Sequence, residues 1–353
     1  MWSSKLRRQR SLISRIFVAF GFLLGGTWLV SVACTKDAGE WRDPSKHKVT
    51  FVTVDERVQL EVLDWGGSGR AVVLLAGSGN TAHVFDDFAP KLTDCCHVYG
   101  ITRRGFGRSS HAATGYDDQR LADDALRVLD ALYLDHPLLA GHSLAGDEMT
   151  TIGRQHSEQI SGLVYLDATA DPGDRSMTDP EFVAAFEKLP VAIRTPPTLD
   201  FSSFAAYRQS QRRANIGVFP ESELRQGFVE RQNGSVGSYK GSTSDIIAAI
   251  GRGQIKRDYS NIQVPLLVFV DYPPPLDDLL RQFGYQPKND AERAAIAAYT
   301  QLTAKRIGNR LDQIRRRIPS VRVVELRGAG HYVFLTRESE VLSEMHRFLR
   351  TLK

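Results

Sequence analysis

Cysteine is scarce in this sequence, with three among 353 residues, at Cys34, Cys95 and Cys96. Two of them are neighbours, and neighbouring cysteines rarely form a disulfide because the bond geometry strains the peptide between them. No cysteine and histidine spacing matches that of a metal site. We therefore expect neither disulfide nor metal, with Cys95 and Cys96 as small buried residues leading into a strand. A chain of this length can bury a sufficient core without such supports.

Acidic residues are absent before Asp37, whereas five basic residues lie within the first fifteen. The whole chain has a formal net charge of +4, so the rest of the chain without these five is close to neutral, at −1. That remainder also lacks a basic stripe with interleaved aromatic residues. The excess positive charge belongs to the N-terminal segment, and we predict no nucleic-acid partner. The five basic residues are Lys5, Arg7, Arg8, Arg10 and Arg15.

Charge is also absent from residues 16–33, an apolar run that directly follows the cationic segment. Secretory signals have this order of a positive region, an apolar region and small residues. Ser31-Val32-Ala33 fits the cleavage pattern, and the Cys34 after it resembles the lipidated cysteine of a bacterial lipoprotein signal, although Ser31 stands where Leu is usual. The run is also just long enough to span a bilayer uncleaved. We expect residues 1–34 to be a signal peptide or N-terminal membrane anchor. The exported protein would then be membrane-anchored or a lipoprotein at the cell envelope, or secreted.

After a polar stretch at residues 35–48, which we interpret as a tether, short apolar runs alternate with amphipathic stretches. Continuous apolar runs bounded in this way are typical of parallel strands buried on both faces. Their alternation with helical patterns predicts an α/β domain over residues 49–353, with a mostly parallel eight-stranded sheet and helices on both faces. The expected strands are 49–54, 58–65, 71–76, 97–102, 137–140, 163–166, 265–270 and 321–326.

Two long segments interrupt this alternation. Residues 171–261 are polar, contain scattered aromatic residues and have helical patterns in patches, so we expect a helical insertion after the sixth strand, called the cap below. Residues 272–319 begin with a run of three prolines and continue with a long helical pattern over 291–317. This second insertion is expected to fold against the cap.

Gly141-His142-Ser143-Leu144-Ala145-Gly146 follows a short apolar strand and begins a helical pattern. This is the context of a nucleophile elbow, in which a serine lies on a sharp turn between strand and helix. The strained turn requires small residues two before and two after the serine, here Gly141 and Ala145, although the strict pattern has Gly at the latter place. The helix N-terminus directs free N–H groups and its positive dipole end at the site. We predict Ser143 as the nucleophile, with His142 packed beside it rather than taking part in the chemistry.

A serine hydroxyl is a weak nucleophile until a base takes its proton. His331 is the candidate base, because it lies in a glycine-flanked loop, Arg327-Gly328-Ala329-Gly330-His331-Tyr332, directly after the last expected strand. A histidine in that loop can reach across the carboxyl edge of a parallel sheet.

The charge that develops on a substrate oxygen requires two N–H donors, which form an oxyanion hole. One is expected from the backbone of Leu144, the residue after the serine. The other is expected from the loop Gly77-Ser78-Gly79-Asn80 after the third strand, where glycines allow close approach of the backbone. Ser78 occupies the expected donor position, with Gly79 or Asn80 as alternatives one or two residues along.

Thr102-Arg103-Arg104-Gly105-Phe106-Gly107-Arg108-Ser109-Ser110 resembles the R-G-x-G-x-S segment of α/β-fold hydrolases after their fourth strand. With the elbow, the strand end at residues 163–168 and the loop at residues 328–331, the resemblance to this family extends from residue 49 to the C-terminus. It implies the α/β-hydrolase fold and a Ser-Asp-His serine hydrolase. Arg103 and Arg104 are expected to brace the loop around the site.

Two aspartates compete for the third place in the triad. Asp167 ends the sixth expected strand, and Asp271 ends the seventh. Most members of the family carry the acid in a turn a few residues past the seventh strand, but prolines 273–275 occupy that place here. A minority, including a bacterial subgroup that this chain resembles, carry it at the end of the sixth strand. The resemblance therefore favours Asp167, with Asp271 as the alternative.

These residues predict two-step acyl transfer through an acyl-serine intermediate. The expected substrate is a small-molecule carboxylic ester, and an amide is the second candidate. No cofactor is implied. A non-catalytic binding protein on the same scaffold and an acyltransferase remain alternatives. The sequence does not predict the substrate, its acyl-chain length or the oligomeric state.

Overall fold

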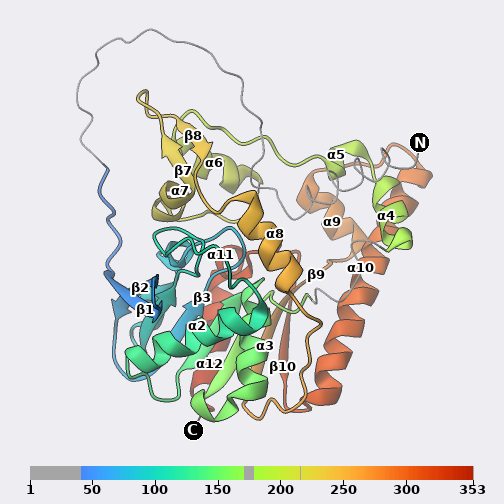
Figure 1. Ribbon diagram of the computed structural model, residues 1–353. Coiled ribbons are helices and arrows are strands. Elements are labelled where there is room, and N and C mark those ends of the chain that lie inside the picture. Colours follow the sequence, from blue (N-terminus) through green and yellow to red (C-terminus); the bar gives the residue numbers. More distant parts are fainter. Residues whose placement is uncertain (1–40, 171–178, 215, 353) are drawn as a thin grey trace, which may run out of the picture. The chain divides into compact units, whose positions relative to one another are not determined.

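The computed structural model describes residues 41–170, 179–214 and 216–352 (Figure 1). The predicted signal or anchor at residues 1–34 lies outside the described residues. Among the residues that are described, no helix is both long enough and apolar enough to cross a membrane. The predicted α/β domain lies in one compact unit, Lys46–Lys353.

Eight strands form one sheet in the order β1-β2-β4-β3-β5-β6-β9-β10. The pairs β1–β2 and β2–β4 are antiparallel, and all the others are parallel. The mostly parallel eight-stranded sheet predicted from the apolar runs is confirmed. The strands are β1 (Lys48–Asp55), β2 (Val58–Gly66), β3 (Arg70–Leu75), β4 (Cys96–Ile101), β5 (Leu138–His142), β6 (Gly162–Leu166), β9 (Leu266–Tyr272) and β10 (Arg322–Arg327).

Helices cover both faces of this sheet (Figure 1). In β3, Val73 and Leu75 belong to one buried cluster with side chains of α2 (Asp118–Ala131), α3 (Ala145–Gln155) and the C-terminal half of α10 (Asp290–Arg317). Val72 and Leu74 point to the opposite face, because side chains alternate along a strand, and they are equally buried. On that face lies α12 (Glu338–Leu349), together with the 3₁₀ helices η1 (Ala82–Phe85) and η2 (Ala89–Leu92). This double cover explains why the central strands are continuous apolar runs.

The cap follows β6 and contains both helices and a small antiparallel hairpin. The hairpin is not part of the helical pattern expected from the sequence. The second insertion follows β9, and its α10 packs against the cap, where the rings of Phe182 and Tyr299 lie 5.1 Å apart. The elements of the two insertions are α4 (Pro180–Glu187), α5 (Val191–Arg194), α6 (Phe204–Ala214), α7 (Glu221–Gly227), β7 (Phe228–Glu230), β8 (Val236–Tyr239), α8 (Ser244–Gly253) and α9 (Leu276–Phe283), before α10.

The two adjacent cysteines differ in exposure. Cys96 is buried at the start of β4, as expected, but Cys95 is exposed. The expectation that both are buried was wrong for Cys95, because this residue lies in the turn before the strand and not in the sheet. Both are free thiols.

Candidate active site

Ser143 lies in the turn between β5 and α3, with a backbone φ of +53°. This left-handed conformation is uncommon for a residue with a side chain and is found mainly where the surroundings enforce it. The neighbours leave no room for a larger residue two positions earlier. A Cβ added to Gly141 would lie 2.7 Å from the Cβ of Ala145 and 2.9 Å from the Sδ of Met149. The small residues expected on both sides of Ser143 are therefore required by close packing.

The loop after β3 lies beside Ser143. A Cβ added to Gly77 would lie 3.1 Å from the Cβ of Ser143, so the two backbones approach closely. Asn80 N–H donates to the Gly77 carbonyl at 3.3 Å, which closes a turn around Ser78 and Gly79, both exposed. Gly79 has a φ of +82°, a conformation that favours glycine. The structure thus brings the loop predicted to donate to the oxyanion next to the predicted nucleophile.

His331 and Asp167 are hydrogen-bonded, with 2.7 Å between Nδ1 of the histidine and Oδ2 of the aspartate. Asp167 directly follows β6, and its φ of +48° turns its side chain out of the strand direction. Its other oxygen, Oδ1, accepts a hydrogen bond from the backbone N–H of Asp271 at 3.1 Å. The structure therefore brings His331 to Asp167, and it places the backbone of Asp271, the alternative acid, behind that carboxylate.

The Asp271 side chain is in a different environment. Burial, and after it the negative charge of Asp167, raises the pKa of Asp271 to about 6. The backbone amides of Gly330 and Ala329 act in the opposite direction. One of its oxygens, Oδ1, is buried without a hydrogen-bond partner among the described residues.

His142 packs beside the site, as expected. Its ring centroid lies 4.5 Å from that of His331 and 4.6 Å from that of Tyr332. Its Nε2 lies 3.1 Å from the His331 carbonyl oxygen, so Nε2 carries the proton and donates it. Burial, and after it the neighbouring His331, holds the pKa of His142 well below its usual range. His142 is therefore a neutral imidazole that supports the backbone of His331.

Arg103 and Arg104 brace the loop after β4, as the sequence indicates. Arg104 forms a two-pronged ion pair with Asp124 of α2, at 2.5 and 2.7 Å. Arg103 pairs with Glu148 of α3 and donates to the Ala76 carbonyl at 2.8 Å, directly before the loop that begins at Gly77.

Sequence reasoning missed Arg257, in the segment that leads from the cap back to the sheet. Its Nε pairs with Asp147 of α3 at 2.5 Å, and its Nη1 donates to the carbonyl of Ala168, the residue after Asp167. The arginine is buried, and it connects α3 to the loop after β6 that carries Asp167. No sequence signal marks it, because the segment around it has no motif.

A second histidine and carboxylate cluster lies near the site, around Asp86. Four donors surround this carboxylate, which satisfies about as many hydrogen bonds as a carboxylate accepts. Burial alone would raise the pKa of Asp86, but hydrogen bonds from His47 and His83 hold it well below its usual range. In turn Asp86 and Glu61 raise the pKa of His83 to about 10, against the effect of burial. The arrangement is that of a buried ion pair. The four donors are His47 Nδ1 (2.9 Å), His83 Nδ1 (2.9 Å), Trp65 Nε1 (3.0 Å) and Ser222 Oγ (2.6 Å).

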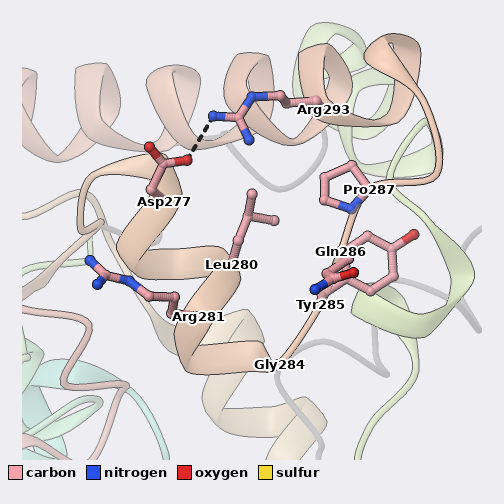
Figure 2. Close-up of a pocket in the computed structure, with 8 residues that line it drawn as sticks. All are labelled: Asp277, Leu280, Arg281, Gly284, Tyr285, Gln286, Pro287 and Arg293. Carbon is pink, nitrogen blue, oxygen red and sulfur yellow. Dashed lines mark hydrogen bonds and ion pairs between the residues drawn. The ribbon is translucent and has the colours of Figure 1, made fainter.

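A pocket of about 730 Å³ lies between α9 and the start of α10 (Figure 2). An ion pair between Asp277 and Arg293, at 2.6 Å, spans one side of it. None of the predicted catalytic residues lines this pocket, so it is separate from the candidate active site. Its lining residues are Asp277, Leu280, Arg281, Gly284, Tyr285, Gln286, Pro287 and Arg293.

Residues 72–344 match the model of the alpha/beta hydrolase family. This chain belongs to that family. Among curated relatives, 2-(acetamidomethylene)succinate hydrolase of Mesorhizobium japonicum is 28% identical over 113 residues, which are 32% of this chain and 40% of that protein. A non-heme chloroperoxidase of Streptomyces lividans is 26% identical over 229 residues, 62% of this chain and 79% of that protein. The chain spans less than half the length of the first curated relatives that it matches.

Solved structures of this alpha/beta hydrolase family share the fold. The crystal structure of E-2-(acetamidomethylene)succinate hydrolase superposes with a TM-score of 0.59 and 20% identity, and the match covers 86% of this chain and 99% of that one. At this identity the likeness establishes the fold and not the substrate.

Proposed function

We propose that this member of the alpha/beta hydrolase family is a serine hydrolase that cleaves a carboxylic ester, or an amide, through an acyl-serine intermediate. The observation that carries the proposal is the 2.7 Å hydrogen bond between His331 and Asp167, with His331 in contact with His142, the residue before Ser143. The order Ser143, Asp167, His331 along the chain is that of the hydrolases of this fold.

In the proposed mechanism, the Asp167 carboxylate accepts a hydrogen bond from Nδ1–H of His331, so the proton stays on Nδ1 and the lone pair of the imidazole is on Nε2. Nε2 removes the hydroxyl proton of Ser143, and the serine oxygen attacks the carbonyl carbon of the substrate. The resulting imidazolium is stabilised by the Asp167 carboxylate and gives its proton to the leaving alcohol or amine. Water activated by the same nitrogen then hydrolyses the acyl-serine.

The oxyanion is proposed to accept hydrogen bonds from the backbone N–H groups of Leu144 and Ser78. Leu144 is the residue that leads into α3, so the positive end of the helix dipole adds to its donor. Ser78 lies in the glycine-rich turn that approaches Ser143. Losing one such donor typically costs about 10²–10³ in rate.

Several relatives are named as hydrolases, which supports hydrolysis as the reaction class. The Mesorhizobium relative is named for an acetamido substrate, and this favours keeping amides beside esters as candidates.

Labelling with a fluorophosphonate probe tests the proposal, because the probe reacts with an activated serine. We expect the purified wild type to be labelled, and Ser143→Ala and His331→Ala to lose the label while remaining folded by circular dichroism. A folded wild type that is not labelled would refute the proposal and favour a binding protein on the same scaffold. Incubation with a labelled ester and an added alcohol tests the acyltransferase alternative. A new ester of the added alcohol would show that the acyl group is transferred to it and not to water.

We propose in addition that the protein is exported and held at the membrane through residues 1–34. The support is the sequence order of five basic residues, an apolar run and small residues. Fractionation of cells expressing the full chain should recover it with the membranes. Recovery in the cytoplasm with an intact N-terminus would contradict this proposal.

A further inference from the structure

One short segment of the cap, residues 217–223, contacts both loops that carry the proposed catalytic groups. The Phe219 ring lies 4.7 Å from the ring of Tyr332, the residue after His331, in an edge-to-face arrangement. Glu223 lies in the first turn of α7 and reaches the loop that follows β3. The cap is thus joined at two points to the proposed active site.

Glu223 binds the end of the proposed oxyanion loop with both of its carboxylate oxygens. Oε1 accepts a hydrogen bond from Asn80 Nδ2 at 2.8 Å, and Oε2 accepts one from Thr81 Oγ1 at 2.5 Å. The backbone N–H of Thr81 lies 3.2 Å from each of the two oxygens. These contacts fix a backbone group and two side chains of the loop at once.

The same network continues to the loop of the proposed base. The side-chain oxygen of Asn80 accepts a hydrogen bond from the Tyr332 hydroxyl at 3.0 Å. Asn80 therefore uses its amide group toward Glu223 and its carbonyl group toward Tyr332. One residue connects the cap, the oxyanion loop and the histidine loop.

The residues of this hydrogen-bond network are buried, so each lost hydrogen bond is costly. Glu223, Asn80 and Thr81 are 5%, 7% and 5% exposed. A buried polar group left without its partner costs about 1–3 kcal/mol, so the loop has a strong preference for the arrangement that satisfies all three. The loop itself contains Gly77 and Gly79 and is free to adopt several backbone conformations without such a constraint.

We propose that Glu223 is a positioning residue of the active site, which holds the oxyanion loop in its donor geometry from the cap and, through Asn80, fixes it relative to His331. This proposal rests on the proposed function. In it the cap acts on the reaction indirectly, because α7 holds the loop that donates to the oxyanion.

The competing explanation is that Glu223 only attaches the cap to the body. The neighbouring residue provides a matched control for that role. Ser222 is equally buried, lies in the same turn of α7 and donates to Asp86 at 2.6 Å, a carboxylate outside the oxyanion loop. Ser222→Ala weakens the attachment of the cap and leaves the contacts to Asn80 and Thr81 in place.

The test compares Glu223→Gln with Ser222→Ala in the full chain. At pH 8.5, above the value of about 7 to which burial raises the pKa of Glu223, the wild-type side chain is a carboxylate with two acceptor oxygens. Glutamine has nearly the same size, but its one carbonyl oxygen cannot replace them, and its amide group faces the donors of Asn80 and Thr81. We expect Glu223→Gln to lower kcat for p-nitrophenyl acetate and the rate of fluorophosphonate labelling about tenfold to a hundredfold, with KM nearly unchanged. Ser222→Ala should stay within about threefold of the wild type in both rates.

Hydrogen–deuterium exchange of peptides covering residues 77–81, which include the Glu223 partners Asn80 and Thr81 and exclude Asp86, provides a readout that does not require activity. Glu223→Gln should speed exchange in this loop, and Ser222→Ala should not. Equal losses of kcat in the two variants, or unchanged exchange in Glu223→Gln, would overturn the positioning role while leaving the serine hydrolase intact. A wild type that is neither labelled nor active would refute the hydrolase itself, and the positioning role with it.

Discussion

The backbone N–H of Asp271 donates a hydrogen bond to the Asp167 carboxylate at 3.1 Å, so two aspartates at the carboxyl ends of neighbouring strands have different places in one site. Asp167 offers one oxygen to this amide and the other to His331. The Asp271 side chain is itself buried, and burial raises its pKa to about 6. The two carboxyl groups are therefore not interchangeable.

Replacing each of these aspartates by asparagine tests their roles. Asp167→Asn presents an amide to Nδ1 of His331 and favours the wrong tautomer, so we expect kcat to fall about 10³–10⁴-fold. Asp271→Asn keeps the backbone N–H that supports Asp167, and its kcat should fall less than about tenfold. Ester hydrolysis or the labelling rate of the two purified variants measures the ranking, and the reverse ranking would sink the assignment of Asp167.

Gly141 tests the packing that enforces the turn at Ser143. Gly141→Ala brings a Cβ to 2.7 Å from the Cβ of Ala145, and such overpacking typically costs about 1–3 kcal/mol. We expect a lower free energy of unfolding in urea and weaker labelling of Ser143. Gly251→Ala, in α8, is the control, because its added Cβ meets nothing within 4 Å and should slightly stabilise the helix. A Gly141→Ala protein as stable and reactive as the wild type would contradict this account.

The sheet, and Ser143 and His331 of the proposed triad, could be predicted because the sequence patterns that indicate them are local. Continuous apolar runs mark strands buried on both faces, and small residues around a serine or histidine mark tight turns. The ends of the strands were less accurate. The sequence predicts the fifth strand at 137–140, whereas β5 extends to His142 because this residue pairs with Leu166 of β6. Strand ends depend on the neighbouring strand, which is distant in sequence.

The contacts that hold the loops of the site in place could not be predicted, because they join residues far apart in the sequence. Glu223 and Asn80 are 143 residues apart, and nothing around either one suggests the other. The sequence favoured Asp167 over Asp271 through the family resemblance alone, since both residues lie at the carboxyl ends of parallel strands. The positive φ of Asp167 turns its carboxylate toward His331, and no sequence pattern shows that conformation.

Removing one partner of the buried ion pair between Arg257 and Asp147 should destabilise the protein more than removing one partner of an exposed pair. Arg257→Met removes the cation paired with buried Asp147 and leaves this carboxylate with the neutral amide of Gln254, at 2.7 Å, and breaking such a pair costs about 3–5 kcal/mol. Arg154 and Asp258 form a partly exposed pair nearby, at 3.5 Å, and Arg154→Met should cost no more than about 1 kcal/mol. Urea unfolding of the two variants measures both values. Equal losses would show that Arg257 does not act through its buried partner.

The pH dependence of stability should reveal the burial of Glu223. Burial raises the pKa of Glu223 to about 7, from an ordinary value of 4.5, although hydrogen bonds from Thr81 and Asn80 act in the opposite direction. Between these two values the folded protein retains a proton that the unfolded chain has lost. The contribution of this group to stability therefore falls as the pH rises from about 4.5 to 7.

Glu223→Gln removes this titration, so the free energy of unfolding of the variant relative to the wild type should rise by about 1–3 kcal/mol between pH 4.5 and pH 8. Asp118 and Asp271 also have raised pKa values, of about 7 and 6, but they are present in both proteins and cancel in the difference. Urea titrations at several pH values over this range measure the difference directly. A difference that stays constant with pH would mean that Glu223 is ionised in the folded protein throughout this range, and that its hydrogen bonds to the oxyanion loop outweigh the cost of its burial.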